Sequence, residues 1–314
     1  MAKIDQKITE NYAIYNGDSC EILPTIKTNS IHLSVYSPPF ADLYNYSSLD
    51  NDLSNCRSYE QFLEHYEFIV KEIYRVTLPG RLTVVHCMDL KKSGINSAYK
   101  DFPGDIIRLH EKIGFYYQAR HCIWKEPLKI ALRTRSLGLM HRQIVKDSSL
   151  CHNAGADYIL VMRKDGENKV PIQHPYFLST YVGIREIPEN LKRFSNIEDP
   201  KTNKLSHWIW QQYASSFWDD IHGGVVLPYK EAKDSEEEKH ICPLQLQVID
   251  RCLILYSNPN EILLTPFMGV GSEIFCAIRA GRKGIGIELK PSYFRQAIKN
   301  IEHAKDIKPE GFLY

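Results

Sequence analysis

The segment that most constrains the fold of this chain is "EILLTPFMGVGSEIFCAIRAGRKGIGIEL", residues 261–289. Its first apolar run predicts a β-strand, a turn containing glycines follows, and "EIFCAIRAG" predicts a helix that ends at Gly281. The second apolar run, "KGIGIEL", predicts another strand, with Glu288 at its end. A strand, a helix and a further strand in this order form a parallel β-α-β unit, so this region predicts an α/β domain.

The N-terminal part of the chain shows the same alternation. Residues 31–36, "IHLSVY", predict a strand, and residues 58–77 carry apolar side chains three or four positions apart, as on one face of a helix. Residues 82–87 predict the next strand, and a short helix that ends near Gly114 precedes a strand through residues 123 and 124. The whole pattern predicts an α/β fold with a mostly parallel sheet and helices on both faces.

The alternation stops between residues 170 and 230 and returns after residue 240. The intervening region mixes aromatic residues, prolines and short amphipathic segments, and we expect Trp208, Trp210 and Trp218 to form its own core. The acidic tract "EAKDSEEEK" that follows is typical of an exposed loop. Residues 1–169 and 240–314 would thus be two halves of one domain, and residues 170–239 an insertion. A helix with Pro243 in its first turn should open the second half.

The turn within residues 261–289 has the features of a cofactor site. Gly269 and Gly271 allow the backbone to approach a ligand closely, and the N-terminus of the following helix offers free N–H groups to a negatively charged group. Glu288 lies 17 residues beyond Gly271, where the second strand would direct a carboxylate at ribose hydroxyl groups. The third glycine of the dinucleotide pattern is absent, so the turn by itself leaves a nicotinamide cofactor and a plain tight turn open.

A second unusual segment is "SVYSPPF", residues 34–40, in which a strand ends at a serine and two prolines. "SPPF" and the distant "TPFMGVGS" resemble the two signature motifs of amino-methylating DNA methyltransferases, and their order resembles the β group of that family. "GFYYQARHCIWKEP" and "HICPLQLQVIDRCLILYSNPNEILL" resemble further family segments. The resemblance implies a Rossmann-like S-adenosylmethionine-dependent methyltransferase fold, with residues 170–239 as the inserted target-recognition region.

The resemblance also implies roles for individual residues. The catalytic residues would be Ser37, Pro38, Pro39 and Phe40. S-adenosylmethionine would be the cofactor, with Glu288 at its ribose hydroxyls, Asp18 near its adenine and Pro243 beside its methionine tail. Its further contacts would be Pro266, Phe267, Gly269, Gly271 and Ser272. Thr265 departs from the pattern, because the family usually has an aspartate there, near the methionine end of the cofactor.

The chemistry of amino methylation explains why such a motif needs these residues. The exocyclic amino group of cytosine or adenine is a poor nucleophile because its lone pair is delocalised into the ring. The Ser37 hydroxyl and the Pro38 carbonyl can accept hydrogen bonds from both N–H groups and favour a tetrahedral nitrogen. Phe40 would stack on a base swung out of the duplex. Catalysis would then rest on positioning and preorganised acceptors, without a metal, and the amino proton would depart to solvent. Serine at the first motif position resembles the cytosine-N4 members of the family, so the resemblance implies cytosine N4 over adenine N6.

The distribution of charge points to the same partner. The net charge of +1 gives no global sign of nucleic-acid binding, but residues 120–146 carry seven basic residues against one acidic residue. A solvated face explains such a run by itself, whereas next to the two motifs it predicts a surface that follows DNA phosphates. The resemblance implies double-stranded DNA as the partner and allows a homodimer and a restriction-enzyme partner. The expected DNA contacts are Lys129, Arg133, Arg135 and Arg142.

Cysteines and apolar runs narrow the remaining possibilities. Eight cysteines without a C-x-x-C pair predict neither a zinc site nor a disulfide framework. His86 and Cys87 form an adjacent pair, but neighbours on a strand point to opposite faces and rarely bind one ion. No apolar run approaches the ~20 residues that cross a bilayer, and the first residues lack the apolar core of a signal peptide. We therefore expect a cytoplasmic protein that contacts no membrane.

Three rival functions share some of these features. A nicotinamide-dependent oxidoreductase would use the glycine turn and Glu288, but it leaves "SPPF" and the basic run unexplained. The glutamine methyltransferases of release factors have a related Pro-Pro motif, but there the glycine motif comes first in the chain. A DNA-binding relative that has lost its activity stays open because of Thr265.

Overall fold

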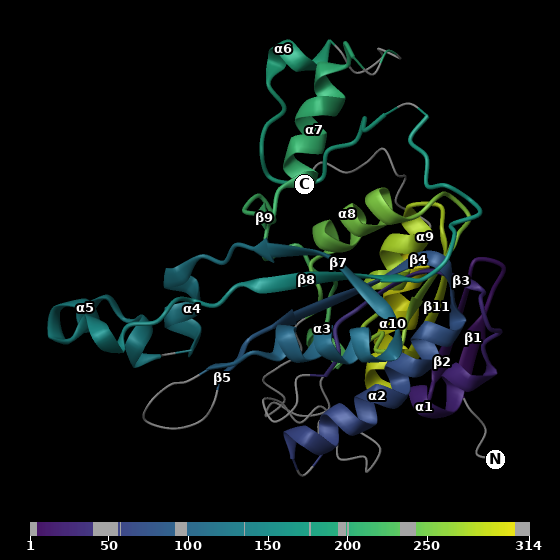
Figure 1. The fold of residues 1–314 in the computed structure, drawn as a ribbon, viewed down its shortest axis with the longest axis horizontal. Helices are drawn as coiled ribbons and strands as arrows, with labels where there is room; N and C mark the ends of the chain where they lie inside the picture. The colour runs from purple at the N-terminus through teal and green to yellow at the C-terminus, as the bar shows by residue number, and fades with distance from the viewer. Residues whose placement is uncertain are drawn as a thin grey trace.

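The computed structural model describes residues 5–39, 56, 58–91, 99–134, 136–175, 177–193, 199, 201–232 and 243–304. These residues form a nine-stranded sheet in the order β1-β2-β11-β10-β3-β4-β8-β7-β9, with helices on both faces (Figure 1). A separate two-stranded ribbon pairs β5 (Leu90–Lys91) with β6 (Tyr99–Lys100). No helix in these ranges combines the length and the apolar character that a membrane span requires.

The large sheet is mostly parallel, as the sequence predicts. Its strands are β1 (Asp5–Ile8), β2 (Tyr12–Asn16), β3 (Ile31–Tyr36), β4 (Thr77–Met88), β7 (Phe115–Ile123), β8 (Asp157–Lys164), β9 (Phe217–Trp218), β10 (Ile262–Thr265) and β11 (Lys283–Glu288). Strands β2, β11, β10, β3 and β4 pair in parallel, whereas β1 and β8 run antiparallel to their neighbours. The antiparallel direction of β8 was not predicted. Residues 124–156 leave the sheet at the end of β7 and re-enter it at the same edge, so the chain makes no crossover of the kind that parallel strands need.

Alternate residues of the strands enter two different cores. Val35 and Val84 belong to the core under α8 (Leu246–Tyr256), α9 (Ser272–Arg279) and α10 (Pro291–His303). Tyr36 and Val85 belong to the core under α1 (Ser19–Ile22), α2 (Tyr59–Val76) and α3 (Phe102–Ile113). The predicted helix over residues 58–77 is α2, which begins where the Ser58 hydroxyl accepts a hydrogen bond from the Gln61 amide at 3.1 Å. Two-residue periodicity therefore decides which face each side chain near the strand ends will reach.

Two excursions leave the sheet (Figure 1). The first joins β7 to β8 through α4 (Pro127–Thr134), η3 (Leu137–Leu139), α5 (His141–Lys146) and η4 (Ser148–Leu150), and it projects away from the molecule. The second carries α6 (Glu189–Lys192), α7 (Lys204–Ala214), β9 and η5 (Lys230–Ala232). Trp218 is fully buried in the core under α8, α9 and α10, and Trp210 is 58% exposed. Trp208 is partly buried against a small apolar cluster of α7, which consists of Leu205, Ile209 and Tyr213. The three tryptophans thus form no core of their own, because β9 pairs with β7 and carries Trp218 into the sheet.

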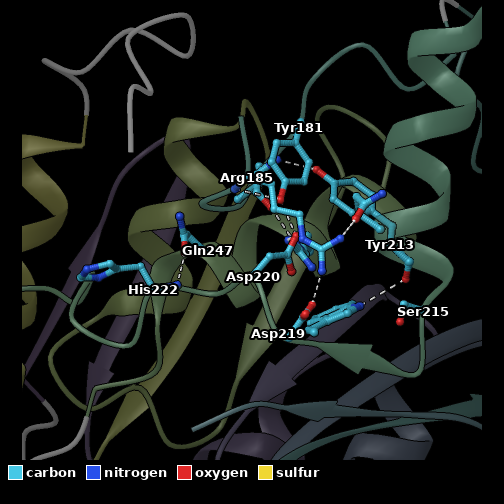
Figure 2. Close-up of polar contacts among 12 residues, drawn as sticks. Tyr181, Arg185, Tyr213, Ser215, Asp219, Asp220, His222 and Gln247 are labelled. Carbon is cyan, nitrogen blue, oxygen red and sulfur yellow. Dashed lines mark hydrogen bonds and ion pairs between the residues drawn. The ribbon is translucent and has the colours of Figure 1, made fainter. Parts of the chain in front are cut away.

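Arg251 of α8 fastens the second excursion to the main domain. Its buried guanidinium forms an ion pair with Asp220 at 2.6 Å and donates to the Val182 carbonyl at 2.7 Å. The same guanidinium lies 5.0 Å from the ring centre of Tyr213. Figure 2 shows Tyr181, Tyr213 and Asp220 together at this contact, with His222 beside Gln247 of α8. The second excursion is therefore held by a buried ion pair, in addition to apolar packing.

Candidate active site

The serine–proline corner and the glycine turn meet at one edge of the sheet. β3 and β10 are parallel neighbours with Leu264 opposite Ser34, so the segments that follow them, at Ser37 and at Phe267, leave the sheet at the same edge. The ring centres of Tyr36 and Phe267 lie 5.9 Å apart. From this pair of strands the chain continues through α2 to β4 on one side and through α9 to β11 on the other. Such a reversal of strand order opens a crevice at the carboxyl ends of the strands, where ligands of open α/β sheets bind.

The two glycines of the turn have different reasons to lack a side chain. Both adopt left-handed backbone angles, with φ of +55° at Gly269 and +92° at Gly271. A Cβ at Gly269 would meet no described atom within 4 Å, so this side of the turn is open. A Cβ at Gly271 would come within 3.1 Å of Ala297 and 3.2 Å of Ile301 on α10. We attributed both glycines to the approach of a ligand; the second one also serves the close packing of α10.

Glu288 holds the glycine turn against β11. One carboxylate oxygen accepts a hydrogen bond from the Gly269 amide at 2.7 Å, and the other accepts one from the Lys290 amide at 2.9 Å. Both oxygens of the carboxylate are therefore oriented by backbone amides. Glu288 ends β11, as the sequence predicts, and its carboxylate also fixes the conformation of the turn.

The loop after β2 is tied to the same turn. The Asn16 side-chain amide donates to the Glu288 carbonyl at 2.8 Å, and the Ser19 hydroxyl donates to the Pro266 carbonyl at 2.5 Å. Between them, Asp18 begins α1, where one carboxylate oxygen accepts a hydrogen bond from the Cys20 amide at 2.8 Å. Asp18 thus lies beside the turn with one oxygen already engaged. Asn16 and Ser19 were missed, because a polar residue after a short strand carries no distinctive signal in the sequence.

The residues around the turn fit a polar ligand such as S-adenosylmethionine. The hydroxyls of Thr265 and Ser272 are buried and have no hydrogen-bond partner among the residues described. Unpaired buried polar atoms are costly, so a ligand that supplies their partners would be bound favourably. Together with the side of Gly269 that no described atom approaches and the carboxylate of Glu288, they are polar groups of the kind that an adenosine derivative binds.

A chain of four polar side chains extends from the serine–proline corner across the sheet. The Ser37 hydroxyl lies 2.7 Å from Nδ1 of His86, Nε2 of His86 lies 3.4 Å from an oxygen of Asp157, and Nζ of Lys125 lies 2.5 Å from the other oxygen. The four residues come from β3, β4, β8 and the end of β7, which are neighbours in the sheet. We call Ser37, His86, Asp157 and Lys125 the polar chain. His86 and Cys87 do point to opposite faces, as expected of strand neighbours, since Cys87 lies in the other core.

Asp157 is ionised within the polar chain. Burial by itself would raise the pKa of Asp157, but the charges and hydrogen bonds of His86 and Lys125 outweigh it and lower the pKa to about 2. The side chain is only 5% exposed, so solvent screens its charge weakly. A fixed negative charge therefore faces His86 at neutral pH.

The remaining predicted residues lie in different situations. Pro243 precedes α8, which begins only at Leu246, because Gln245 is the extended N-cap and the Leu246 amide is bound to the Val225 carbonyl at 3.0 Å; the expected place in the first helical turn is wrong. Lys129 on α4 and Arg142 on α5 are exposed. Phe40 and Arg135 are outside the described residues, as is the side chain of Arg133.

Comparison with known proteins adds the family. The model of the N6/N4 methyltransferase type, described as DNA methylase, matches residues 31–299. The chain is 23% identical over 302 residues to the type II methyltransferase M.MthZI of Methanothermobacter thermautotrophicus, covering 90% of this chain and 74% of that protein. It is also 23% identical over 307 residues to the DNA adenine methyltransferase YhdJ of Escherichia coli (strain K12), covering 96% and 86%.

Two solved structures resemble the fold. The PvuII DNA methyltransferase (cytosine-N4-specific) matches with a TM-score of 0.60 and 17% identity over 95% of this chain and 91% of that chain. A DNA modification methylase of Thermus thermophilus, TTHA0409, solved in complex with S-adenosyl-L-methionine, matches with a TM-score of 0.59 and 21% identity over 94% of each chain. These likenesses confirm the Rossmann-like methyltransferase fold. Since the family model spans most of the sequence, the chain belongs to the N6/N4 family of DNA methylases, which use S-adenosylmethionine as cofactor.

Proposed function

We propose that this protein transfers a methyl group from S-adenosylmethionine to the N4 amino group of a cytosine in double-stranded DNA. The observation that carries the proposal is that Ser37 and the Gly269 turn follow neighbouring parallel strands, β3 and β10, at the same edge of the sheet. Family membership limits the target to an exocyclic amino group of cytosine or adenine. Serine at position 37 favours cytosine; adenine N6 is the alternative, and relatives of both kinds exist.

The glycine turn would bind the cofactor, which supplies a methyl group on a positively charged sulfur. Glu288, which already orders the turn through two amides, would accept hydrogen bonds from the ribose hydroxyls, and Asp18 would lie near the adenine. Pro243 would lie beside the methionine tail. The open side of Gly269 would face the cofactor. The further contacts would be Pro266, Phe267, Gly271 and Ser272.

The serine–proline corner would hold the amino group of the target base. Pro38 and Pro39 lack N–H donors, so the backbone here offers carbonyl acceptors only. The Ser37 hydroxyl and the Pro38 carbonyl would each bind one N–H of the amino group and turn its lone pair toward the methyl carbon. Phe40 would stack on the flipped base.

DNA would be held by the exposed excursion between β7 and β8 and read by the inserted region. Lys129 on α4 and Arg142 on α5 are exposed in this excursion, as phosphate contacts must be, and Arg133 and Arg135 complete the proposed set. Sequence-specific contacts would come from residues 170–239. Action in the cytoplasm stays a prediction from the pattern of apolar residues in the sequence, and a homodimer and a restriction-enzyme partner stay predictions from the family resemblance.

The deciding experiment identifies the methylated atom. Purified protein is incubated with unmethylated plasmid and radiolabelled S-adenosylmethionine, and the DNA is digested to nucleosides for chromatography and mass spectrometry. We expect N4-methylcytosine with the wild type and none with Ser37→Ala. N6-methyladenine alone would refute the cytosine assignment. Binding of the cofactor without any methylated nucleoside would instead identify an inactive relative.

A further inference from the structure

The polar chain does more than the proposed transfer requires of Ser37. An acceptor for one amino N–H needs only a hydroxyl, yet this hydroxyl is bound to His86, and His86 in turn faces a buried carboxylate that is paired with Lys125. Each member lies two residues from a strand residue of the core beneath α8–α10, so all four converge at the same edge of the sheet. Those core residues are Val35, Val84, Ile159 and Ile123.

The charge of Asp157 determines where the protons of the polar chain lie. A carboxylate can only accept hydrogen bonds, so it favours a proton on Nε2, the His86 nitrogen that faces it at 3.4 Å, although this contact lacks the geometry of a formed hydrogen bond. With the proton on Nε2, Nδ1 would accept a hydrogen bond from the Ser37 hydroxyl, which lies 2.7 Å away. With its own proton directed to His86, the Ser37 oxygen presents only lone pairs to the crevice. Ser37 is therefore oriented as an acceptor before any base arrives.

We propose that His86 orients the Ser37 hydroxyl and receives, through it, the proton that the target amino group loses. The inference rests on the proposed function. When the amino nitrogen bonds to the methyl carbon, the bond from that carbon to the sulfur breaks and its electron pair stays on the sulfur, so the nitrogen then carries one proton too many. That N–H bond breaks, its electron pair stays on nitrogen, and the proton joins the Ser37 oxygen while the original hydroxyl proton moves to Nδ1. The resulting imidazolium is stabilised by Asp157 and later releases its proton to solvent.

The same chain does not make an acyl-transfer site, although serine, histidine and aspartate occur together. An acyl enzyme needs N–H donors beside the nucleophile to bind an oxyanion. The two residues after Ser37 are prolines, which have none. The surroundings of the serine therefore suit an incoming N–H donor and oppose a developing oxyanion.

Among the described residues, the charge of Asp157 acts on His86 directly and the charge of Lys125 acts on it through Asp157. Asp157 faces it from β8, and Lys125, after β7, pairs with Asp157. Asp89 and Arg120 lie against Tyr158, whose side chain points to the opposite face of the sheet. Changes at Asp157 and at Lys125 should therefore affect His86 in opposite directions, which gives the proposal a sign that a purely structural role lacks.

The first experiment needs no turnover. In a two-bond 1H–15N correlation spectrum of 15N-histidine-labelled protein near pH 8, the signals that disappear in His86→Gln belong to His86. We expect them to show a protonated Nε2 and a bare Nδ1. A proton on Nδ1 would overturn the proposal, because the ring would then donate to Ser37.

The second experiment measures kcat for methyl transfer between about pH 5.5 and about pH 9. His86→Gln should lower kcat by roughly 10²-fold or more and abolish the acid limb, while the Kd for S-adenosylmethionine stays unchanged. Asp157→Asn should move the acid limb to lower pH, because the imidazolium loses its counter-ion. Lys125→Met should move it to higher pH, because Asp157 then acts on His86 unopposed. The exposed Lys27→Met is the matched control and should leave the profile unchanged.

The outcomes separate this proposal from the proposed function. Shifts of the acid limb in the same direction, or no shift, would refute the proton transfer. Lys125 is partly exposed, so Lys125→Met keeps the test valid if the buried variants unfold, which thermal melting would show. An enzyme that methylates adenine instead refutes only the cytosine assignment, and the limb shifts then decide the role of His86. With no methylation at all, the histidine spectrum still decides the proton positions.

Discussion

Glu273 at the start of α9 gives the protein a pH-dependent stability. Its side chain is only 4% exposed. Burial, joined by the nearby charge of Glu288, raises its pKa from 4.5 to about 8, against the opposing hydrogen bond of its own amide. We expect Glu273→Gln, which keeps the shape and removes the ionisable group, to stabilise the cofactor-free protein above acidic pH.

The magnitude follows from the linkage between protonation and folding. A carboxyl whose pKa is higher in the folded protein favours folding fully below its unfolded pKa, and this contribution is lost as the pH rises toward the folded pKa. At about 1.4 kcal/mol per pH unit, the difference between 4.5 and about 8 corresponds to roughly 5 kcal/mol once Glu273 is ionised, with about 3 kcal/mol lost by pH 7. Wild type and variant should therefore match near pH 4.5 and diverge above it.

Urea unfolding of both proteins near pH 5, 7 and 8.5 measures this difference. The exposed Glu10→Gln serves as the control and should show no comparable divergence. A stability difference between wild type and Glu273→Gln that does not change with pH would refute the reasoning. A wild type that becomes more stable than the variant as the pH rises would reverse the expected sign and refute it as well.

Further predictions concern the turn, the inserted region and DNA binding. Gly271→Ala should cost about 1–3 kcal/mol in urea unfolding, because its Cβ meets α10, whereas Gly269→Ala should cost less and mainly raise the Kd for S-adenosylmethionine in calorimetry. Arg251→Met leaves the Asp220 carboxylate buried without its counter-ion, although the Tyr181 hydroxyl still donates to it, and should cost about 3–5 kcal/mol. Adding Asp220→Asn should recover part of that cost, and an additive double variant would contradict the ion pair. Lys129→Ala should reduce the salt dependence of DNA binding by about one unit of slope in fluorescence anisotropy, equally for all sequences, and an unchanged slope would exclude a phosphate contact.

The sequence was most informative where a signal is local. The local patterns of residues 31–36 and 261–289 predict their strands, turn and helix. The two motifs together indicate the family. Parallel pairing of β3 with β10 then follows from the topology of such folds, which is why the meeting of Ser37 with the glycine turn could be expected.

The polar chain was missed because its partners are distant in the sequence. His86 lies 49 residues from Ser37, and its environment depends on β8, whose antiparallel pairing the alternation did not predict. In the sequence, His86 drew notice only as the neighbour of Cys87, and the geometry of a strand argued against that pair as a metal site. The second reason for Gly271 was hidden in the same way, since Ala297 and Ile301 come close to it only in the folded protein.

Lys125 is the second residue of the excursion between β7 and β8, Asp157 is the first residue of β8, and these two residues form an ion pair. The ion pair thus joins the two ends of the excursion, and its member Asp157 also faces His86. A force that bound DNA exerts on the excursion would act on this ion pair before it acts on the rest of the sheet. DNA binding by the excursion and proton acceptance by His86 would then both depend on the ion pair between Lys125 and Asp157.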